Sequence, residues 1–331
     1  MKTRTLGTTG LEVSAIGFGC MGLSQGYGPA DDAESLATLH RAIDLGITLL
    51  DTAMSYGAGH NEELVGRAIA GRRDRVVLAT KFGIVRGPDG VSLDGRPEHV
   101  RGHLEASLRR LGVDYVDLYY LHRVDPEVPV EDTVGAMAEL VAEGKVRFLG
   151  LSEVDGKTLE RAGTAHPISA VQSEWSLLWR EIEDDVVPAA RRLGVGLVPY
   201  SPLGRGLLTG TLTSQQFAGG SVPAGDFRAG DPRFEGEHLR QNLAVVDVIR
   251  QIATDNGLAP GQLALAWLLA QGADVVPVPG TRRAARVADN VAAAELELPA
   301  GVRERLDTVA ARSAWAGDRR SFAAHGTTRS G

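Results

Sequence analysis

The chain has 331 residues, of which 43% are hydrophobic and 23% charged, a composition typical of a globular protein with a large core. Its 35 basic and 42 acidic side chains give a net charge of −7, which argues against a nucleic-acid binder that coats phosphates. The single cysteine, Cys20, excludes an internal disulfide, and the apolar runs are far shorter than the ~20 residues of a membrane span. The N-terminus MKTRTLGTTG lacks an apolar signal segment, so we expect a cytoplasmic protein with no membrane partner.

Eight short β-type segments recur along the chain, and each except the last is followed by a helical pattern. They cover residues 15–21, 48–53, 76–81, 116–122, 146–152, 168–174, 196–201 and 275–279. Six of the seven intervals between them fit one strand plus one crossover helix, which favours a parallel sheet. The pattern therefore predicts an α/β fold, a closed (β/α)8 TIM barrel.

Three stretches lie outside this repeat. Residues 4–14 predict an N-terminal β-hairpin that caps the bottom of the barrel, because a Thr-Thr-Gly turn separates two β-like pieces. Residues 204–236 form a glycine- and proline-rich loop of a length that is usually functional, followed by helical patterns over 237–256 and 261–270. Residues 299–312 predict an extra C-terminal helix, and 313–331 predict a flexible tail. No low-complexity linker divides the chain, so we expect one domain over residues 1–331.

Gly17, Gly19 and Gly22 match the G-x-G-x-x-G spacing of a dinucleotide-binding Rossmann fold. That motif requires the glycines to open a helix, whereas the next helical pattern starts about nine residues later, near Asp31. Eight strands also exceed the Rossmann count. The glycines are therefore interpreted as a tight rim of the barrel.

Four reactive side chains fall at or just after the ends of three successive predicted strands. Asp51 lies near the end of the second, Lys81 ends the third, His122 ends the fourth, and Tyr56 follows Asp51 in the next loop. Taken singly, each has a structural explanation, such as a helix cap or a core histidine. Because active sites of parallel barrels assemble at the carboxyl ends of strands, the four together predict proton transfer to a carbonyl oxygen.

The expected chemistry assigns each group a role. Lys81 stabilises the phenolate and lowers the pKa of Tyr56, which is otherwise about 10. Asp51 is the counter-ion that keeps the buried Lys81 charged, and His122 orients the carbonyl. If hydride reaches the carbonyl carbon, the developing oxyanion takes the proton of Tyr56.

At these residues the sequence strongly resembles the aldo-keto reductases, a barrel family that reduces carbonyls with NADPH. The resemblance covers nearly the whole chain, including GFGCMG, DTAMSYGAGHNEELVGRAI, LATKFG and DLYYLHRVDP. It implies that Asp51, Tyr56, Lys81 and His122 form the catalytic tetrad, with Tyr56 as general acid and an aldehyde or ketone as substrate.

The same resemblance implies a cofactor site. Ser152 and Gln172 would bind the nicotinamide carboxamide, with Glu153 standing where the family often has asparagine, and Tyr200 would stack on the nicotinamide ring. The glycine-rich strip with Ser201, Leu203, Gly204, Arg205 and Gly206 would wrap the pyrophosphate, because glycine permits close backbone approach. The remaining implied contacts are Gly19, Met21, Asp51 and, in PVPGTRRAARVADN, Gly280, Thr281, Arg282, Arg286 and Asn290.

The charge of that last motif bears on the choice of cofactor. Thr281 can cap a helix whose N-terminal amides attract anions, and Arg282, Arg283 and Arg286 add positive charge. Arginine gives multidentate phosphate contacts, which favours NADPH over NADH, although Gly280 stands where many members carry lysine. A solvated basic helix start is the structural alternative.

Substrate specificity is expected from loops that contain Tyr27, Phe82, 123–129 and 204–236. Trp175, Trp179 and Phe227 could line an apolar pocket, though the two tryptophans have the spacing of core residues on a helix. Two other functions stay open: a Schiff-base enzyme that uses Lys81, and a cofactor-binding redox sensor with residual activity. The sequence predicts no metal site and leaves the oligomeric state open.

Overall fold

The computed structural model describes residues 1–87, 90–220 and 224–319. Seven parallel strands form one sheet in the order β11-β10-β9-β8-β5-β4-β3, so each crossover returns to a neighbouring strand. The strands are β3 Phe18–Gly19, β4 Leu49–Asp51, β5 Val77–Phe82, β8 Val116–Leu121, β9 Val146–Ser152, β10 Ala170–Glu174 and β11 Gly196–Tyr200. Each lies within or close to a predicted segment, although the first is only two residues long.

The eighth predicted segment, residues 275–279, closes the barrel without forming a regular strand. It hydrogen-bonds with β11 on one side and with the first segment on the other, and one parallel bridge joins Leu197 to Val275. Pro277 and Pro279 have no amide hydrogens, so the segment can only accept bonds on the side facing β3. The bonds run from Val276 N to Leu197 O (2.8 Å), Val278 N to Pro199 O (3.0 Å), Gly17 N to Pro277 O (2.9 Å) and Gly19 N to Pro279 O (3.3 Å).

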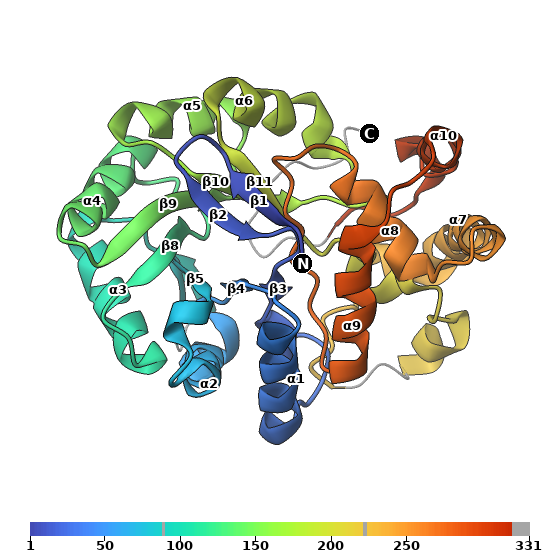
Figure 1. Ribbon diagram of the computed structural model, residues 1–331, viewed down its shortest axis with the longest axis horizontal. Coiled ribbons are helices and arrows are strands. Elements are labelled where there is room, and N and C mark those ends of the chain that lie inside the picture. The colour runs from blue at the N-terminus through green and yellow to red at the C-terminus, as the bar shows by residue number, and fades with distance from the viewer. Residues whose placement is uncertain (88–89, 221–223, 320–331) are drawn as a thin grey trace.

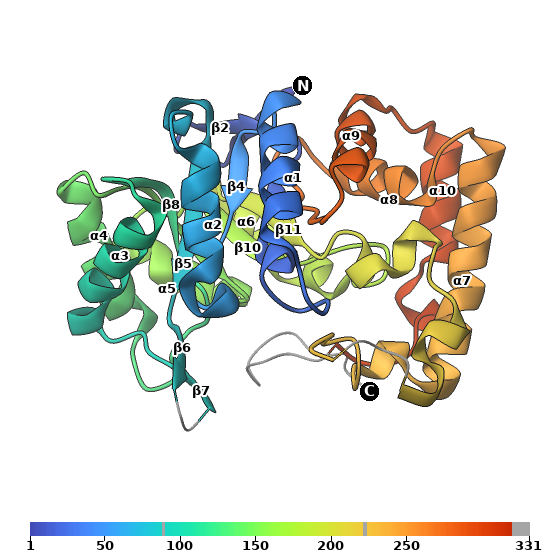
Figure 2. The ribbon, with the colours of Figure 1, turned by 90° about the horizontal axis from the view of Figure 1, so that it is seen from below.

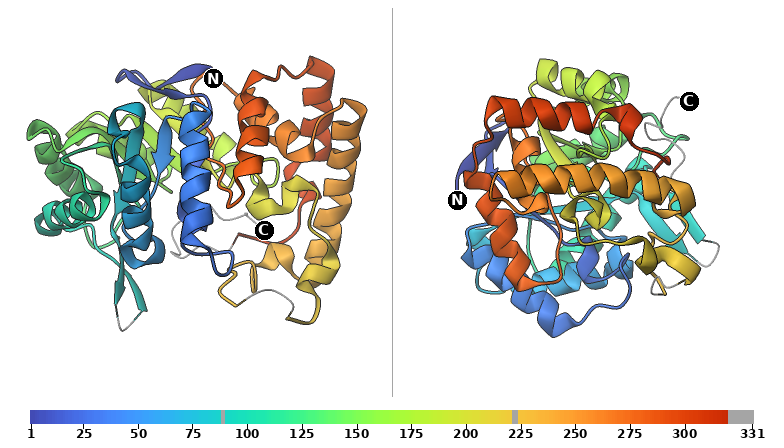
Figure 3. Two further views of the ribbon diagram at one scale, coloured as in Figure 1. Left: turned by 60° about the horizontal axis from the view of Figure 1, so that its bottom comes forward. Right: turned by 90° about the vertical axis from the view of Figure 1, so that its right-hand side faces the viewer.

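Helices surround the sheet, as a (β/α)8 barrel requires (Figure 1). The crossover helices are α1 Asp32–Asp44, α2 His60–Ile69, α3 Pro97–Leu111, α4 Val130–Ala142, α5 Gly156–Ala165, α6 Val186–Leu193, α8 Pro260–Leu269 and α9 Ala284–Ala292. Two further helices, α7 Gly236–Asp255 and α10 Ala300–Val309, pack side by side outside the ring (Figure 3). The C-terminal helix α10 is therefore present where the sequence predicts it. None of the helices in the described part of the chain is long and apolar enough to cross a membrane.

The predicted N-terminal hairpin consists of β1 Thr3–Leu6 and β2 Leu11–Ser14, which pair antiparallel. It lies at the end of the barrel opposite the β6–β7 hairpin (Figure 2). Its side chains Leu6, Leu11 and Val13 are buried and pack with residues of the barrel interior. The turn fits tightly, since a Cβ on Gly7 would lie 2.3 Å from the carbonyl oxygen of Gly194. The hairpin thus closes the bottom of the barrel, and any ligand must enter from the other end.

Two further parts of the structure differ from the sequence expectations. The loop after β5 contains a second hairpin, β6 Ile84–Gly87 with β7 Gly90–Leu93, which the pattern search did not predict and which projects beyond the barrel (Figure 2). Residues 313–319, predicted as part of a flexible tail, are instead packed on the protein. Trp315 is 4% exposed and Arg319 is 7% exposed, because Trp315 joins the main core and Arg319 pairs with Glu153. Residues 320–331 of the predicted tail lie outside the described residues.

Candidate active site

Strand alternation explains why the predicted polar residues meet at one end of the barrel. On β4, β5 and β8, the residues two positions earlier, Leu49, Ala79 and Tyr120, belong to the interior cluster. Side chains two residues apart on a strand share a face, so Asp51, Lys81 and His122 also point inward, one layer nearer the mouth. The same alternation applies after Gly150, Ala170 and Val198, and it directs Ser152, Gln172 and Tyr200 into this layer.

Lys81 is the centre of the site. Its side chain is fully buried, and its ammonium donates to Asp51 Oδ1 at 2.5 Å, to the Thr52 carbonyl at 2.9 Å and to Tyr56 Oη at 3.3 Å. The other carboxylate oxygen of Asp51 accepts from Gln172 Nε2 at 2.8 Å. The structure thus links the acid, the cation and the phenol that the sequence singles out, and it gives Gln172 a protein partner.

His122 lies beside the phenol. Its ring meets the ring of Tyr56 edge-on, with centroids 5.6 Å apart and an interplanar angle of 83°. Its Nδ1 is 3.5 Å from Ser55 Oγ. A carbonyl oxygen placed between Tyr56 and His122 would therefore face two groups that can donate a hydrogen bond.

The pKa of Tyr56 corrects one expectation. Burial raises it above its ordinary value, and this effect outweighs the attraction of Lys81 for the phenolate, which acts in the predicted downward direction. The negative charge of Asp51 adds to the rise. Tyr56 is therefore a neutral phenol at rest that holds its proton, and the predicted net lowering is wrong for this structure.

The charges of Lys81 and His122 follow from their surroundings. Burial by itself lowers the pKa of Lys81, but Asp51 and Tyr56 raise it more, so the amine stays an ammonium. Burial lowers the pKa of His122 well below its ordinary value, and Arg123, Lys81 and Arg86 lower it further. The imidazole is therefore neutral at pH 7 and has one hydrogen available to donate.

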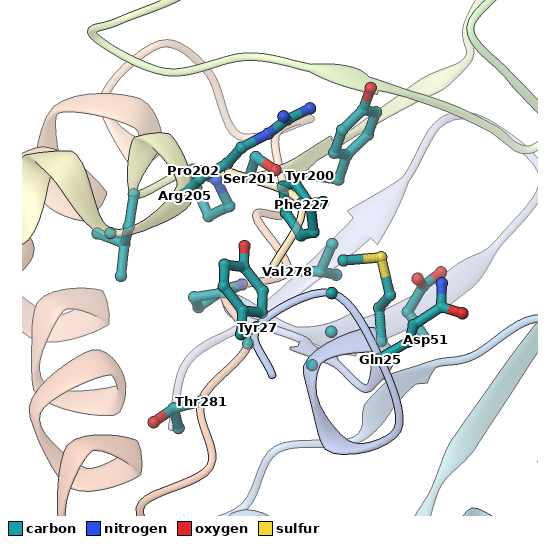
Figure 4. Close-up of a pocket in the computed structure, with 18 of the residues that line it drawn as sticks. Gln25, Tyr27, Asp51, Tyr200, Ser201, Pro202, Arg205, Phe227, Val278 and Thr281 are labelled. Carbon is teal, nitrogen blue, oxygen red and sulfur yellow. The ribbon is translucent and has the colours of Figure 1, made fainter. Parts of the chain in front are cut away.

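A cavity of about 930 Å³ opens above these groups. Asp51, Tyr56 and His122 line it, whereas Lys81 lies beneath them. All predicted cofactor residues except Gly204 line it too: Gly19, Met21, Asp51, Ser152, Gln172, Tyr200, Ser201, Leu203, Arg205, Gly206, Gly280, Thr281, Arg282, Arg286 and Asn290. In Figure 4, Asp51 and Thr281 lie at opposite ends of this lining. The cavity is long enough to join the two groups of residues that the sequence predicts separately.

Comparisons with known proteins agree with this geometry. Residues 15–311 match the sequence profile of the aldo/keto reductase family. The chain belongs to the aldo-keto reductase family. Membership implies an oxidoreductase that acts on carbonyl compounds with a nicotinamide cofactor. A curated relative, probable aldo-keto reductase 1 of Glycine max, is 47% identical over 296 residues, which cover 88% of this chain and 84% of that protein.

Solved structures give the same result. A glycerol dehydrogenase from Gluconobacter oxydans superposes with a TM-score of 0.85 at 29% identity, covering 97% of this chain and 99% of that one. An aldo/keto reductase from Klebsiella pneumoniae, solved in complex with NADP and acetate, superposes with a TM-score of 0.71 at 29% identity, covering 93% and 95%. The barrel described above is therefore that of the aldo-keto reductases.

In this aldo-keto reductase, Arg282 lines the cavity, but its guanidinium is already occupied by the protein. Its guanidinium donates to four main-chain carbonyls of the loop after β3: Gly22 (2.6 Å), Tyr27 (3.1 Å), Gly28 (2.8 Å) and Pro29 (2.8 Å). Arg283 and Arg286 are exposed at the start of α9, and Thr281 Oγ1 accepts from Arg283 N at 3.1 Å. The hydrogen bonds of Arg282 thus fix a loop, and the two other arginines carry the free positive charge at this end.

Two loops meet over the cavity of the aldo-keto reductase. The loop after β3 and the segment 204–234 touch where the rings of Tyr27 and Phe227 lie 4.8 Å apart and Phe227 N donates to Gly26 O at 3.0 Å (Figure 4). Arg205, expected on the pyrophosphate, forms an ion pair with Asp231 and lies over the Phe227 ring at 4.6 Å. Because Asp231 neutralises its guanidinium, Arg205 forms part of the cavity wall without adding net positive charge there.

Backbone strain gathers on the same side of the barrel. Four non-glycine residues of the described chain have positive φ: Ala58 (54°), Glu153 (56°), Ser201 (50°) and Arg205 (55°). All four follow the carboxyl ends of barrel strands. Such conformations cost about 1–3 kcal/mol each and concentrate at functional sites, which agrees with the position of the cavity.

Glu153 positions Arg319, a cavity residue that the sequence does not predict. Its Oε1 accepts from Glu174 N at 3.0 Å, and its Oε2 pairs with Arg319 Nη2 at 2.5 Å, so it faces Arg319 instead of the cavity. Arg319 does line the cavity, and its Nη1 is 3.4 Å from Tyr200 Oη. No local pattern marks Arg319, because it stands in a polar C-terminal stretch far from Glu153 in sequence.

The predicted aromatic residues lie either at the cavity or in the core. Tyr27 and Phe227 line the cavity, whereas Trp175 and Trp179 are each at most 1% exposed and lie in the core. Phe82 is also buried, stacked on Tyr119 with centroids 4.9 Å apart. Of these side chains, only Tyr27 and Phe227 are therefore placed to contact a substrate or cofactor.

Proposed function

We propose that the protein reduces aldehydes or ketones to alcohols with NADPH, and that Tyr56 is the general acid. The observation that carries this proposal is the position of the Lys81 ammonium, which bonds both Asp51 and the Tyr56 hydroxyl under the floor of the cavity. This arrangement holds a neutral phenol at the cavity wall with a positive charge behind it. Such a pair suits a reaction in which negative charge develops on a carbonyl oxygen.

Each side chain has a defined task. The dinucleotide, when bound, supplies the hydride. Tyr56 donates its proton to the carbonyl oxygen, and Lys81 stabilises the phenolate that remains. The neutral His122 donates a hydrogen bond to the same oxygen and orients it. Asp51 keeps Lys81 protonated, and Gln172 holds the carboxylate of Asp51 in place.

The residues present fit a phosphorylated dinucleotide. The cavity volume of about 930 Å³ lies at the upper end of the range of roughly 300–1,000 Å³ for ligand pockets, which leaves room for a cofactor and a small substrate. At the end marked by Thr281, the exposed Arg283 and Arg286 stand at the N-terminus of α9, where helix amides also favour anions. We infer that these two arginines hold the ribose phosphate of NADPH, while Arg282 holds the loop beside it.

The test is loss of NADPH absorbance with a panel of aldehydes and ketones, measured for the wild type and for Tyr56→Phe. We expect turnover to fall by about two to four orders of magnitude, because general acid catalysis contributes that much, while NADPH binding measured by fluorescence stays near normal. Tyr115→Phe is the matched control, since Tyr115 is an exposed tyrosine that stacks on Arg73 away from the cavity. Retained turnover in Tyr56→Phe would overturn the assignment.

The Schiff-base alternative loses support from the structure. A lysine that attacks a carbonyl needs a lowered pKa and a free amine, whereas the pKa of Lys81 is raised and its ammonium makes three hydrogen bonds. Failure of borohydride to trap substrate on Lys81 would exclude it. A redox sensor with residual activity would bind NADPH but show negligible turnover across the whole panel.

A further inference from the structure

The cavity is lined by eight arginines, and four of them are already neutralised or occupied by the protein. Arg205 pairs with Asp231, Arg228 with Asp226 and Arg319 with Glu153. Arg282 is occupied by main-chain carbonyls of the loop after β3. Arg283 and Arg286 stand at the phosphate end, which leaves two arginines to be explained at the tetrad end.

Arg123 is the first of these. It directly follows His122 at the end of β8, is partly buried and lines the cavity. Its Nη1 donates to the His122 carbonyl at 2.6 Å and to Ser152 Oγ at 3.1 Å. Its Nε is buried without a hydrogen-bond partner in the described chain, and no carboxylate of residues 1–87, 90–220 or 224–319 forms an ion pair with it. A buried donor without an acceptor is uncommon in proteins, and this one belongs to a side chain that lines the cavity.

Arg86 is the second. It lies on β6 of the projecting hairpin, lines the cavity and is exposed. Its Nε donates to the Ser55 carbonyl at 3.3 Å, and the hydroxyl of Ser55 is 3.5 Å from His122 Nδ1. No ion pair is formed by Arg86 within the described segments. Both arginines help to lower the pKa of His122, so both charges are felt where the carbonyl would bind.

The charges around the tetrad do not balance. Lys81 is neutralised by Asp51 and Arg319 by Glu153, which leaves the charges of Arg86 and Arg123 uncompensated. This excess of positive charge stands out on a chain whose net charge is −7. Arg123 bonds the His122 carbonyl and Arg86 the Ser55 carbonyl, whereas Thr281 lies at the other end of the lining from Asp51 (Figure 4). The phosphates assigned to α9 therefore do not explain this charge.

We propose that Arg123 and Arg86 form an anion subsite beside the tetrad, and that the preferred substrates are carbonyl compounds bearing a carboxylate. Arg123 lines the cavity and forms no ion pair within the described residues, so its planar guanidinium can pair with a substrate carboxylate while the substrate carbonyl faces Tyr56. Arg86, exposed on the β6–β7 hairpin and lining the cavity, adds charge that attracts the anion. This inference rests on the proposed reduction of carbonyls and names its substrate class.

Substrates of equal shape and different charge provide the test. The 3- and 4-carboxybenzaldehydes are compared with the corresponding formylbenzamides, whose neutral amide replaces the carboxylate. We expect kcat/KM to be about tenfold higher or more for the acid of at least one pair, because a hydrogen bond to a charged group contributes this much. The preference should shrink with added NaCl, since ions screen a partly exposed pair.

Variants assign the preference to residues. Arg123→Gln and Arg86→Gln should each reduce the acid-to-amide ratio of kcat/KM severalfold. Arg109→Gln, an exposed arginine on α3, removes the same charge and should leave the ratio unchanged. Arg86→Gln is informative even if Arg123→Gln folds poorly, because Arg86 is exposed.

The outcomes separate this inference from the proposed function. Reduction of acid and amide at equal rates by the wild type would overturn the subsite and leave the proposed function intact. A preference that survives in both variants would overturn the assignment to these arginines. If neither compound nor any member of the carbonyl panel is reduced, the proposed function itself fails.

Discussion

Replacing Lys81 with methionine removes the charge at the centre of the site at nearly constant length. Asp51, whose side chain is 5% exposed, then loses its ion pair and keeps the hydrogen bond from Gln172. Breaking a buried pair by removing one partner costs about 3–5 kcal/mol. The carboxyl can escape by taking up a proton, which at pH 7 costs about 4 kcal/mol because an ordinary aspartic acid has a pKa about three units lower. Both routes give an expected loss of about 4 kcal/mol in the free energy of unfolding.

Urea unfolding measures this loss. The double variant Asp51→Asn/Lys81→Met should recover most of it, because neither partner is then charged. Lys157→Met, an exposed lysine on α5, should change the free energy of unfolding by no more than about 0.5 kcal/mol. The single variant should also gain stability as the pH falls from 7 to 5, since its folded state then binds more protons than the unfolded chain. A loss below about 1 kcal/mol, or a double variant no more stable than the single, would refute the reasoning.

Three further predictions follow from individual contacts. Burial and nearby cations lower the pKa of His122, so the free energy of unfolding should decrease below pH ~6.5 by up to about 1.4 kcal/mol per pH unit, and His122→Asn should flatten that slope in pH-dependent urea titrations. Arg286→Ala should raise the KM for NADPH about tenfold without affecting NADH, whereas Arg282→Ala should raise both by similar factors through the loop after β3. Arg319→Met should cost about 3 kcal/mol in urea unfolding, most of it recovered by adding Glu153→Gln, because the buried carboxylate is then no longer charged.

The sequence predicts that Asp51, Lys81 and His122 converge because two regularities act together. Strand alternation decides which face a side chain takes, and the parallel order of the sheet decides at which end it lies. Asp51, Lys81 and His122 each stand two residues beyond an apolar interior residue, at the carboxyl end of their strands. Both properties depend only on residues close together in the sequence, so the convergence of the three side chains could be predicted without a structure.

Side-chain partners distant in sequence could not be predicted in this way. Arg282 was assigned to a phosphate from its local charge, but the carbonyls that hold it belong to a loop more than 250 residues earlier in the chain. Arg319 pairs with Glu153, which stands 166 residues earlier in the chain, so the local sequence predicts a flexible tail throughout. The sequence also predicts a lowered pKa for Tyr56, whereas the structure raises it. The rise depends on how deeply the ring is buried, which no local sequence pattern indicates.

The raised pKa of Tyr56 is compatible with a role as proton donor, and it suggests how Lys81 contributes. An interaction accelerates a reaction only to the extent that it strengthens on the way to the transition state. In the resting site the ammonium faces a neutral hydroxyl at 3.3 Å, and its strongest partner is Asp51. In the proposed reaction, the same ammonium faces a phenolate in a buried, poorly screened site once the proton of Tyr56 has moved to the substrate oxygen. The attraction between Lys81 and Tyr56 therefore grows as the reaction proceeds, and burial, which keeps the phenol neutral beforehand, also makes that growth larger.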